Sequence, residues 1–181
     1  MGLHHKDFTF DLKKITKQGS FAGYGSLFGV EDSYKEVVVA GAFKKTLARH
    51  KKEGRLPSML WQHRSGEPIG IWTKMLEDAK GLYVEGQINL DVRRGVEAHS
   101  LMKQGAISGL SIGFHTVKSI YDETTNIREL LEVDLWEVSV VTFPALSPAR
   151  ISDVKSTHTQ NDLEELSIAL GLRGAALDIK G

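Results

Sequence analysis

The chain has 181 residues, which is enough for one well-packed core and too few for two full-sized domains. Lys and Arg total 23, and Asp and Glu also total 23, so the composition lacks the basic excess typical of nucleic-acid-binding proteins. No cysteine is present, which excludes a disulfide framework and thiolate chemistry. Apolar runs stay well short of the roughly 20 residues of a membrane-spanning helix, so we expect neither a nucleic acid nor a membrane as partner.

Seven short β-like runs, bounded by Gly, Pro, Asp and Asn, dominate the chain. They cover residues 21–30, 36–40, 56–63, 68–77, 82–90, 106–121 and 127–143. Two inserted runs look helical, residues 42–54 with Gly54 as a stop and residues 91–105 with Asp91 placed to cap the helix. Many strands with a few helices predict a mainly β fold with flanking helices (α+β), either a barrel or a sandwich elaborated at its edges.

The chain divides by composition into three parts. Residues 1–20 form an N-terminal segment, and residues 21–150 form the domain that holds the predicted strands. Residues 151–181 begin as a polar, aperiodic linker and continue as a short amphipathic helix. The apolar positions of this helix are Leu163, Leu166, Ile168 and Leu170. Such a helix could bind a partner, direct the protein into an assembly, or pack on its own domain.

Two serines lie three residues apart in the glycine-rich stretch GAISGLSIGF, residues 105–114. Alternation along a strand places Ser108 with large apolar residues on one face. It places Ser111 on the other face between Gly109 and Gly113, which leave room for a substrate backbone to approach the hydroxyl. Ser111 is therefore a candidate nucleophile, and Ser108 is not. The alternative is an ordinary strand that tolerates a serine and two glycines at a bend.

A serine hydroxyl needs a base to take its proton, and the chain has seven histidines. His115 shares the predicted face of Ser111, but four residues along a strand span about 13 Å, beyond hydrogen-bond reach. Five others are assigned to tails (His4, His5 and His158) or to helix surfaces (His50 and His99). His63 remains, at the end of a predicted strand before a turn-rich segment, where it would lie at the rim of the sheet. A loop histidine with no catalytic task is the alternative.

Glu137 is the third candidate. Alternation through LLEVDLWEVSVVTF places this carboxylate on a mostly apolar face that runs from Leu131 to Phe143. Burial of an ionised carboxylate without a partner costs several kcal/mol, so Glu137 needs a hydrogen-bond donor or a cation if this face is interior. A histidine N–H would satisfy it, and an ion pair with Lys or Arg is the alternative.

Five segments, in order and at consistent spacing, carry a resemblance to a known family. They are GYGSLFGVEDSYKEVVVAGAF, LPSMLWQHRSGEPIGIW, GLYVEGQINL, ISGLSIGF and LWEVSVVTFPA, within about Phe21 to Pro148. Together they resemble the phage prohead (capsid maturation) serine proteases, which are related to the herpesvirus assemblins. The resemblance implies a closed or partly open β-barrel of roughly seven strands flanked by helices, similar to the herpesvirus proteases.

The resemblance also implies a function. A serine endopeptidase of this family acts without a cofactor, inside the immature capsid in the bacterial host cytoplasm, and cuts scaffold or major capsid precursor proteins. Its base matches His63 in WQH, its nucleophile matches Ser111 in GLSIGF, and its third member matches Glu137 in LWEVSVV. The herpesvirus relatives have a histidine in the third place, so this chain departs from them there. A carboxylate should orient and polarise the imidazole more strongly.

Backbone N–H groups commonly stabilise the negative charge of the tetrahedral intermediate. The related viral enzymes imply that these donors come from the loop after the third triad strand, which here is TFPALSPA. Pro144 has no N–H, so we expect Phe143 or Ala145 to be the oxyanion donor.

Two proteins of other functional classes are alternatives to a serine endopeptidase. A non-catalytic capsid assembly or scaffold protein could keep the fold with an idle triad. A metal-dependent hydrolase is disfavoured, and no metal is expected, because the chain lacks H-E-x-x-H or a comparable ligand spacing. The herpesvirus relatives suggest a homodimer, although nothing in the sequence requires one. The tail from Ile151 is either removed by self-cleavage or carries the enzyme to the scaffold.

Overall fold

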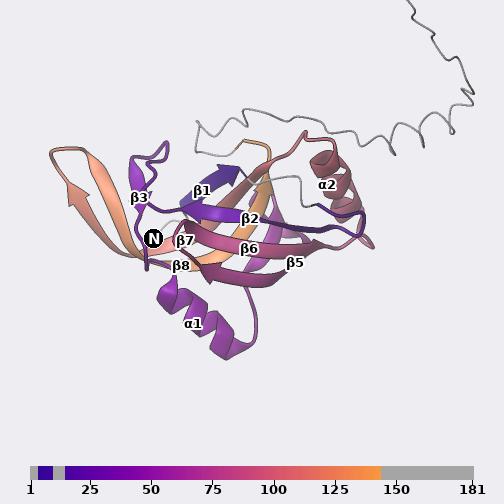
Figure 1. The fold of residues 1–181 in the computed structure, drawn as a ribbon, viewed down its shortest axis with the longest axis horizontal. Coiled ribbons are helices and arrows are strands. Elements are labelled where there is room, and N and C mark those ends of the chain that lie inside the picture. The colour runs from indigo at the N-terminus through magenta and orange to yellow at the C-terminus, as the bar shows by residue number, and fades with distance from the viewer. Residues whose placement is uncertain (1–3, 10–14, 144–181) are drawn as a thin grey trace, which may run out of the picture. The chain divides into compact units, whose positions relative to one another are not determined.

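The computed structural model describes residues 4–9, as backbone only, and residues 15–143. Its elements are β1 (His4–Thr9), β2 (Ser20–Leu27), β3 (Glu36–Val38), α1 (Lys44–Glu53), β4 (Ser58–Trp61), β5 (Arg64–Glu77), β6 (Gly81–Ile88), α2 (Arg93–Lys103), β7 (Gly109–Asp122) and β8 (Ile127–Val141). Figure 1 shows a curled sheet with α1 and α2 packed at well-separated places on it.

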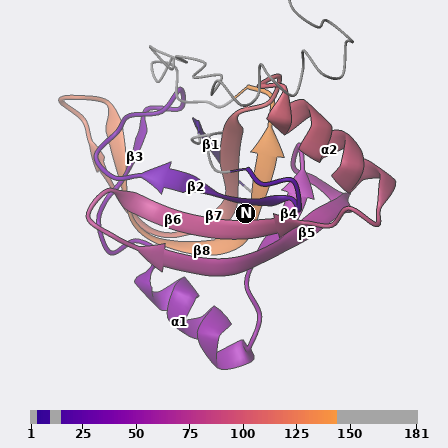
Figure 2. The ribbon, with the colours of Figure 1, turned by 45° about the vertical axis from the view of Figure 1, so that its right-hand side comes forward.

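The strands form one eight-stranded sheet in the order β1-β7-β8-β4-β5-β6-β2, and β3 joins β8 outside this path. β3 and β4 run parallel to β8, and the other neighbours are antiparallel. The sheet curls into a half-barrel (Figure 2), and the described strands do not close it by pairing β1 with β2. The expected mainly β fold with flanking helices is therefore observed in its partly open form, and a closed barrel is not confirmed.

The core lies where side chains from distant strands meet. A Cβ at Gly25 of β2 would contact Leu82 of β6, Ile112 of β7 and Val138 of β8, although β2 and β7 lie at opposite ends of the strand order. These apolar side chains are buried, so the two ends of the sheet pack against each other across the interior. The side chains of β7 and β8 that alternate with Ile112 and Val138 project from the opposite face of the sheet.

All seven predicted strands are present, most with shorter bounds. The sequence analysis does not predict β1, and its placement of His4 and His5 in a tail is wrong because both residues lie in this strand. β1 pairs with β7, from His4 opposite Phe114 to Thr9 opposite Gly109. The segment HHKDFT has little apolar alternation, so its strand conformation comes from pairing with a neighbour rather than from local pattern.

The two described helices lie in the predicted places. Gly54 ends α1 in a left-handed conformation (φ 66°), as predicted, and its N–H reaches the carbonyls of His50 and Lys51. The predicted cap of α2 is wrong: Val92 is the N-cap, and the N–H of Asp91 is held by Oδ1 of Asn89, so the helix starts one residue later. Neither described helix has the length and apolar character needed to span a bilayer.

β7 and β8 form a long hairpin with two different halves. The inner half, where Gly109–Phe114 pair with Leu135–Val141, is covered by the body of the protein. The outer half projects from it (Figure 1), and its β7 strand is exposed from Val117 to Asp122, whereas its β8 strand also pairs with β3 and keeps Leu130 and Val133 buried. A bulge separates the halves, because Gly113 pairs with Glu137 and Phe114 with Leu135, which leaves Trp136 as an extra residue.

Candidate active site

The register of β7 against β8 brings two candidate residues to one face. Ser111 lies opposite Ser139, and Gly113 lies opposite Glu137. Directly opposed residues of antiparallel strands project to the same side, with Cβ atoms about 5 Å apart. Because Ile112 projects into the core, Ser111, Glu137 and Ser139 share the other face of the sheet.

Gly113 makes room for the carboxylate of Glu137. A Cβ at residue 113 would clash with Oε1 of Glu137 and lie 2.9 Å from its Cδ and Cγ. Any larger side chain would therefore displace the carboxylate. Of the two glycines expected to leave room for a substrate backbone beside Ser111, Gly113 does not do so, because the side chain of Glu137 occupies the space above it.

His63 lies within the two-residue turn that joins β4 to β5, just beyond the strand end where the sequence analysis places it. Trp61 pairs with Arg64, so Gln62 and His63 are the central residues, with φ of 52° and 59°. Positive φ at both positions is the pattern of a type I′ turn, which usually contains Asn or Gly. Because each non-glycine residue in this region costs about 1 kcal/mol or more, surrounding contacts must hold the turn in place.

Gln62 ties the turn to the end of β8. Its Nε2 donates to Oγ1 of Thr142 at 2.7 Å, and its Oε1 accepts from the Thr142 N–H at 3.3 Å. Its own N–H donates to the carbonyl of Val140 at 3.1 Å. On the other side, the Arg94 guanidinium of α2 lies 5.6 Å from the ring centre of Trp61. These contacts fix the position of His63 relative to β8.

A hydrogen-bonded network joins the turn to β8. Nδ1 of His63 lies 2.6 Å from Oε1 of Glu137. Because an ionised carboxylate only accepts, Nδ1 carries the hydrogen, and the basic lone pair of the neutral ring is at Nε2. Ser139 Oγ donates to Oε2 of Glu137 at 2.6 Å and accepts from the His63 backbone N–H at 3.1 Å.

The His63–Glu137 pair is shielded from water. The Glu137 side chain is 6% exposed and the His63 side chain 20%. Electrostatic interactions strengthen as solvent is excluded, so an imidazolium formed at His63 would be strongly stabilised by the carboxylate. The arrangement is that of a base whose orientation and tautomer are set by an acid.

Ser111 is fully buried, and its Oγ makes no hydrogen bond with any residue in the described part of the chain. Native structures rarely leave a buried hydroxyl in this state, so it calls for an explanation such as a catalytic role. Ser111 is the register neighbour of Ser139, which itself contacts both His63 and Glu137. The structure thus brings His63 and Glu137 into direct contact and places Ser111 beside their shared partner.

The other histidines have different surroundings. His50, predicted on a helix surface, is buried, and its Nε2 lies 2.9 Å from the carbonyl of Leu135, because α1 packs this face against β8. His99 contacts a backbone carbonyl, and His115 packs edge-to-face on a tryptophan ring. His158 lies outside the described residues. Within residues 15–143, no group of three or more His, Asp or Glu side chains could hold a metal ion.

The remaining sequence candidates lie at the margins of the strands. Ser108 is half-buried and precedes β7, so its expected place within a strand is wrong. Phe143 does not share the buried face of Glu137, since β8 ends at Val141 and Phe143 is 84% exposed beyond it. Ala145 lies outside the described residues, so the choice of oxyanion donor stays a prediction.

Sequence analysis does not identify Ser139 as a functional residue, although the signal is present. Ser139 follows Glu137 by two positions in a predicted strand, and such residues share a face. A second polar residue on a predominantly apolar face indicates a hydrogen-bonded group. Gln62 carries no comparable signal, because its role depends on the turn geometry and on the distant Thr142.

Comparisons with known proteins agree on one family. The profile described as "Caudovirus prohead serine protease" matches residues 8–164. The prohead protease of Enterobacteria phage HK97 is 36% identical over 158 residues, which cover 83% of this chain and 69% of that protein. The prohead protease of Escherichia phage T5 is 30% identical over 128 residues, which cover 70% of this chain and 59% of that protein.

A solved structure shares the fold. The bacteriophage T4 capsid assembly protease superposes with a TM-score of 0.64 at 13% identity, covering 77% of this chain and 96% of that chain. At this identity the similarity establishes the architecture alone. Similarity to the herpesvirus proteases is not confirmed by these comparisons.

Proposed function

Because the chain belongs to the caudovirus prohead serine protease family, we propose that it is a serine endopeptidase of capsid maturation that uses Ser111, His63 and Glu137. The resemblance carried by the five sequence segments is confirmed by the family match. The proposed substrates are scaffold or major capsid precursor proteins inside the assembling procapsid, and the name prohead protease of the HK97 and T5 relatives supports a substrate within the prohead.

The observation that carries this proposal is the 2.6 Å contact between Nδ1 of His63 and Oε1 of Glu137, next to the buried Ser111. A structural ion pair with Lys or Arg was the alternative for Glu137, and the contact with His63 favours the catalytic role. The type I′ turn adds support, because a strained non-glycine conformation at His63 is typical of functional sites.

In the proposed reaction, Nε2 of neutral His63 accepts the proton of Ser111 as Oγ attacks the scissile carbonyl. The imidazolium then donates this proton to the leaving amine, and a water molecule activated by the same base releases the acyl group. Glu137 holds Nδ1–H, fixes the tautomer and stabilises the imidazolium. Ser139 holds the second carboxylate oxygen, which keeps Oε1 directed at the ring. The backbone N–H of Phe143 or Ala145 would bind the oxyanion.

Access to Ser111 is part of the proposal. Since Ser111 is fully buried in this state, the catalytic cycle begins with a local opening that admits the scissile carbonyl. The same burial is the observation that favours the rival function, a capsid assembly or scaffold protein whose triad is idle. The two functions differ in whether substrate cleavage depends on the Ser111 hydroxyl.

Cleavage of a purified capsid precursor protein tests the proposal. We expect the wild-type protein to cut this substrate and the Ser111→Ala variant to leave it intact. Ser108→Ala is the matched control, because it removes the other serine hydroxyl of the same stretch and should keep full activity. Full cleavage by Ser111→Ala would overturn the assignment of the nucleophile, and intact substrate with the wild type would favour the assembly protein.

A further inference from the structure

Most polar contacts between helix α1 and the sheet are made with β8. Thr46 Oγ1 accepts the N–H of Leu135 at 3.1 Å, and His50 Nε2 lies 2.9 Å from the carbonyl of the same residue. Lys45 pairs with Glu132 at 2.6 Å, and the neighbouring Arg49 pairs with Asp134. All of these partners belong to β8, so α1 is held along β8, and its polar contact with β5 is at the N-cap Phe43, whose N–H donates to Glu77.

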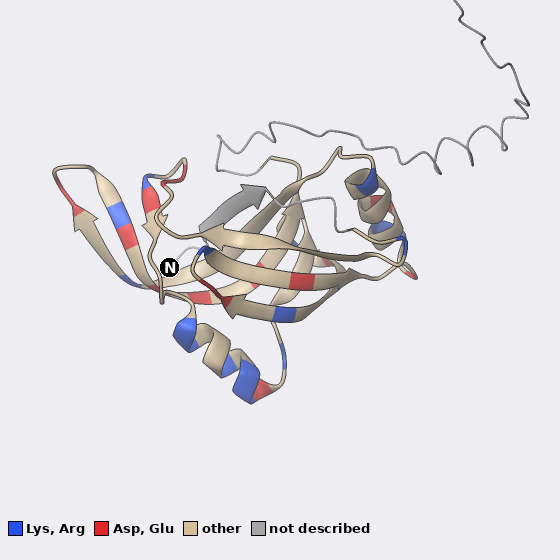
Figure 3. Ribbon diagram, viewed as in Figure 1, with Lys and Arg blue, Asp and Glu red and all other residues tan. Residues whose placement is uncertain are grey.

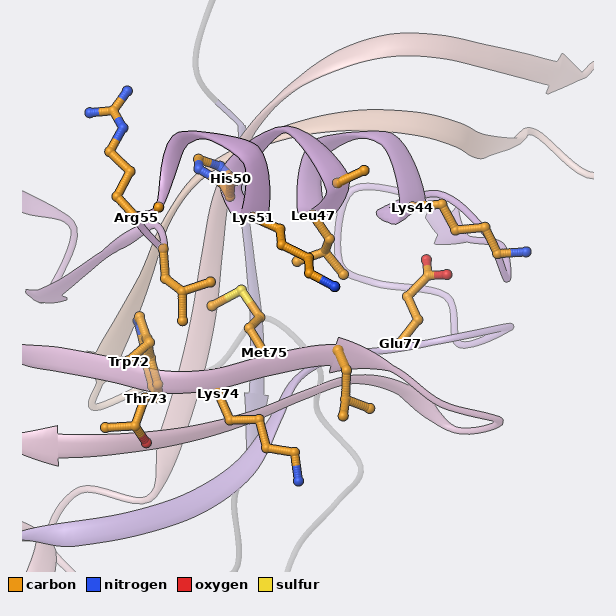
Figure 4. Close-up of a pocket in the computed structure, with 14 residues that line it drawn as sticks. Lys44, Leu47, His50, Lys51, Arg55, Trp72, Thr73, Lys74, Met75 and Glu77 are labelled. Atoms are coloured by element: carbon orange, nitrogen blue, oxygen red, sulfur yellow. The ribbon is translucent and has the colours of Figure 1, made fainter.

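A groove of about 770 Å³ lies between α1 and β5 (Figure 4). Its apolar lining comes from α1, the loop that follows and β5, and consists of Leu47, Leu56, Met75, Leu76 and the buried Trp72. Apart from Trp72, these side chains are only half-buried, so they present apolar surface to the groove. Its volume is within the range of established binding pockets, about 300–1,000 Å³.

Basic side chains surround this groove. Figure 3 shows Lys and Arg gathered along α1, and Lys44, Lys51, Arg55 and Lys74 line the groove. Arg55 and Lys74 are paired with Glu53 and Glu85. Lys44 and Lys51 have no carboxylate partner among the described residues, in a chain whose formal net charge is zero.

The one acidic residue that lines the groove is already engaged. Oε1 of Glu77 accepts the backbone N–H of Phe43, the N-cap of α1, at 2.8 Å. This contact satisfies an N–H at the start of the helix and fixes the carboxylate at that end. Glu77 keeps its negative charge at the Phe43 end of the groove, but neither Lys44 nor Lys51 forms an ion pair with it among the described residues, so both ammonium groups can pair with a ligand.

We propose that the groove between α1 and β5 is a docking site for an acidic amphipathic segment of a partner protein. Apolar side chains of the segment enter the groove between Leu47 and Met75, and its carboxylates pair with Lys44 and Lys51. A nucleic acid fits less well, because both aromatic rings that line the groove, those of Trp72 and His50, are buried and cannot stack with a base. The site uses none of the residues assigned to catalysis, so it does not depend on the proposed peptidase activity.

Fluorescence polarisation with a designed probe tests the site. The probe is a labelled twelve-residue peptide with leucines at i, i+3, i+4 and i+7 and glutamates at most other positions. The protein is the full-length Ser111→Ala variant, so that binding is measured without cleavage. We expect saturable micromolar binding that weakens as salt is raised, because the lysine contacts are screened.

Paired charge reversals identify the surface. The Lys44→Glu/Lys51→Glu variant should bind about tenfold more weakly or worse, since each reversal replaces an attraction by a repulsion. The Lys103→Glu/Lys118→Glu variant carries the same change in net charge on exposed lysines outside the groove and should bind like the parent. A probe with lysine in place of glutamate should not bind to the parent.

Three results would overturn the proposal: no binding of the acidic probe, equal weakening by both double variants, or equal binding of the acidic and basic probes. Circular dichroism of both double variants checks that the fold is retained, and both are expected to fold because the four lysines are exposed. If the binding results contradict the docking site while the wild type cuts its substrate normally, the docking proposal is wrong and the proposed peptidase activity is unaffected.

Discussion

The two halves of the β7–β8 hairpin are both antiparallel, are separated by the bulge at Trp136, and have very different surroundings. In the inner half, Ser111, Glu137 and Ser139 are buried. In the outer half, polar residues such as Ser119 and Glu129 face solvent on strands of the same hairpin. One continuous ladder thus carries a buried polar network at one end and a solvated arm at the other.

This difference shows what burial does to a polar side chain. In the inner half, Glu137 and Ser139 have defined partners, and loss of a partner leaves a desolvated group at a cost of about 1–3 kcal/mol. In the outer half, water replaces a lost partner, and the cost is small. Matched substitutions in the two halves should therefore differ sharply in both activity and stability.

Neutralisation of the Glu137 carboxylate should have the largest effect on turnover. Glu137→Gln keeps the shape of the side chain but cannot hold the imidazole tautomer by charge, so we expect turnover to fall by up to about 10⁴-fold. Glu129→Gln, the same change in the outer half, should leave turnover unchanged. Single-turnover cleavage assays measure both variants. Similar activity in the two variants would remove Glu137 from the mechanism.

A substitution that fills the space above Gly113 should have the second-largest effect on turnover. In Gly113→Ala, the new methyl group pushes Oε1 of Glu137 away from His63, and a displacement of about 1 Å costs on the order of 10²-fold in turnover. Gly66→Ala is the control, because a Cβ there would meet no atom within 4 Å. If Gly113→Ala keeps wild-type activity, the carboxylate position is not critical.

Removal of the hydroxyl that links the network should have a moderate effect. Ser139→Ala removes the donor to Oε2 of Glu137 and the acceptor of the His63 N–H, so the free energy of unfolding should fall by about 1–3 kcal/mol. Ser119→Ala in the outer half should change it by less than about 0.5 kcal/mol. Urea denaturation of both variants gives the comparison, and equal values would contradict the buried network.

The smallest effect, on the pH dependence of stability, is expected at Asp122 near the tip of the outer half. The backbone N–H of Thr124 donates to Asp122 and, with the hydroxyl of Thr125, lowers the pKa of the Asp122 carboxyl. A carboxyl with a lowered pKa in the folded state stabilises the fold above its ordinary value of about 3.9, and this contribution is lost as pH falls through the lowered pKa. Carboxyl titration by NMR should show this lowered pKa in the wild type. In Asp122→Asn, the free energy of unfolding at acidic pH should differ only slightly from that of the wild type.

Much of this fold follows from local pattern. β-like runs bounded by Gly, Pro, Asp and Asn identify seven of the strands, and Gly54 identifies the end of α1. β1 is missed because its strand conformation depends on pairing with β7. The burial of His50 is missed because it depends on how α1 packs against Leu135.

For the site, face alternation and family resemblance select His63, Ser111 and Glu137, and the structure brings two of them into contact. The fit of Gly113 to the carboxylate and the role of Ser139 could not be predicted. Both depend on the β7–β8 register and on the bulge at Trp136, and neither feature is encoded by a residue pattern.

Covalent labelling of Ser111 is a direct test of whether its hydroxyl is activated by His63. A small fluorophosphonate reacts with a serine whose proton is taken by a neighbouring base, so the account predicts that mass spectrometry finds one adduct, on Ser111. Labelling should decline as pH falls, because a protonated His63 cannot accept the Ser111 proton, and it should be lost in His63→Ala. A folded protein that cuts its substrate with Ser111 unlabelled, or that labels equally well without His63, would contradict the account.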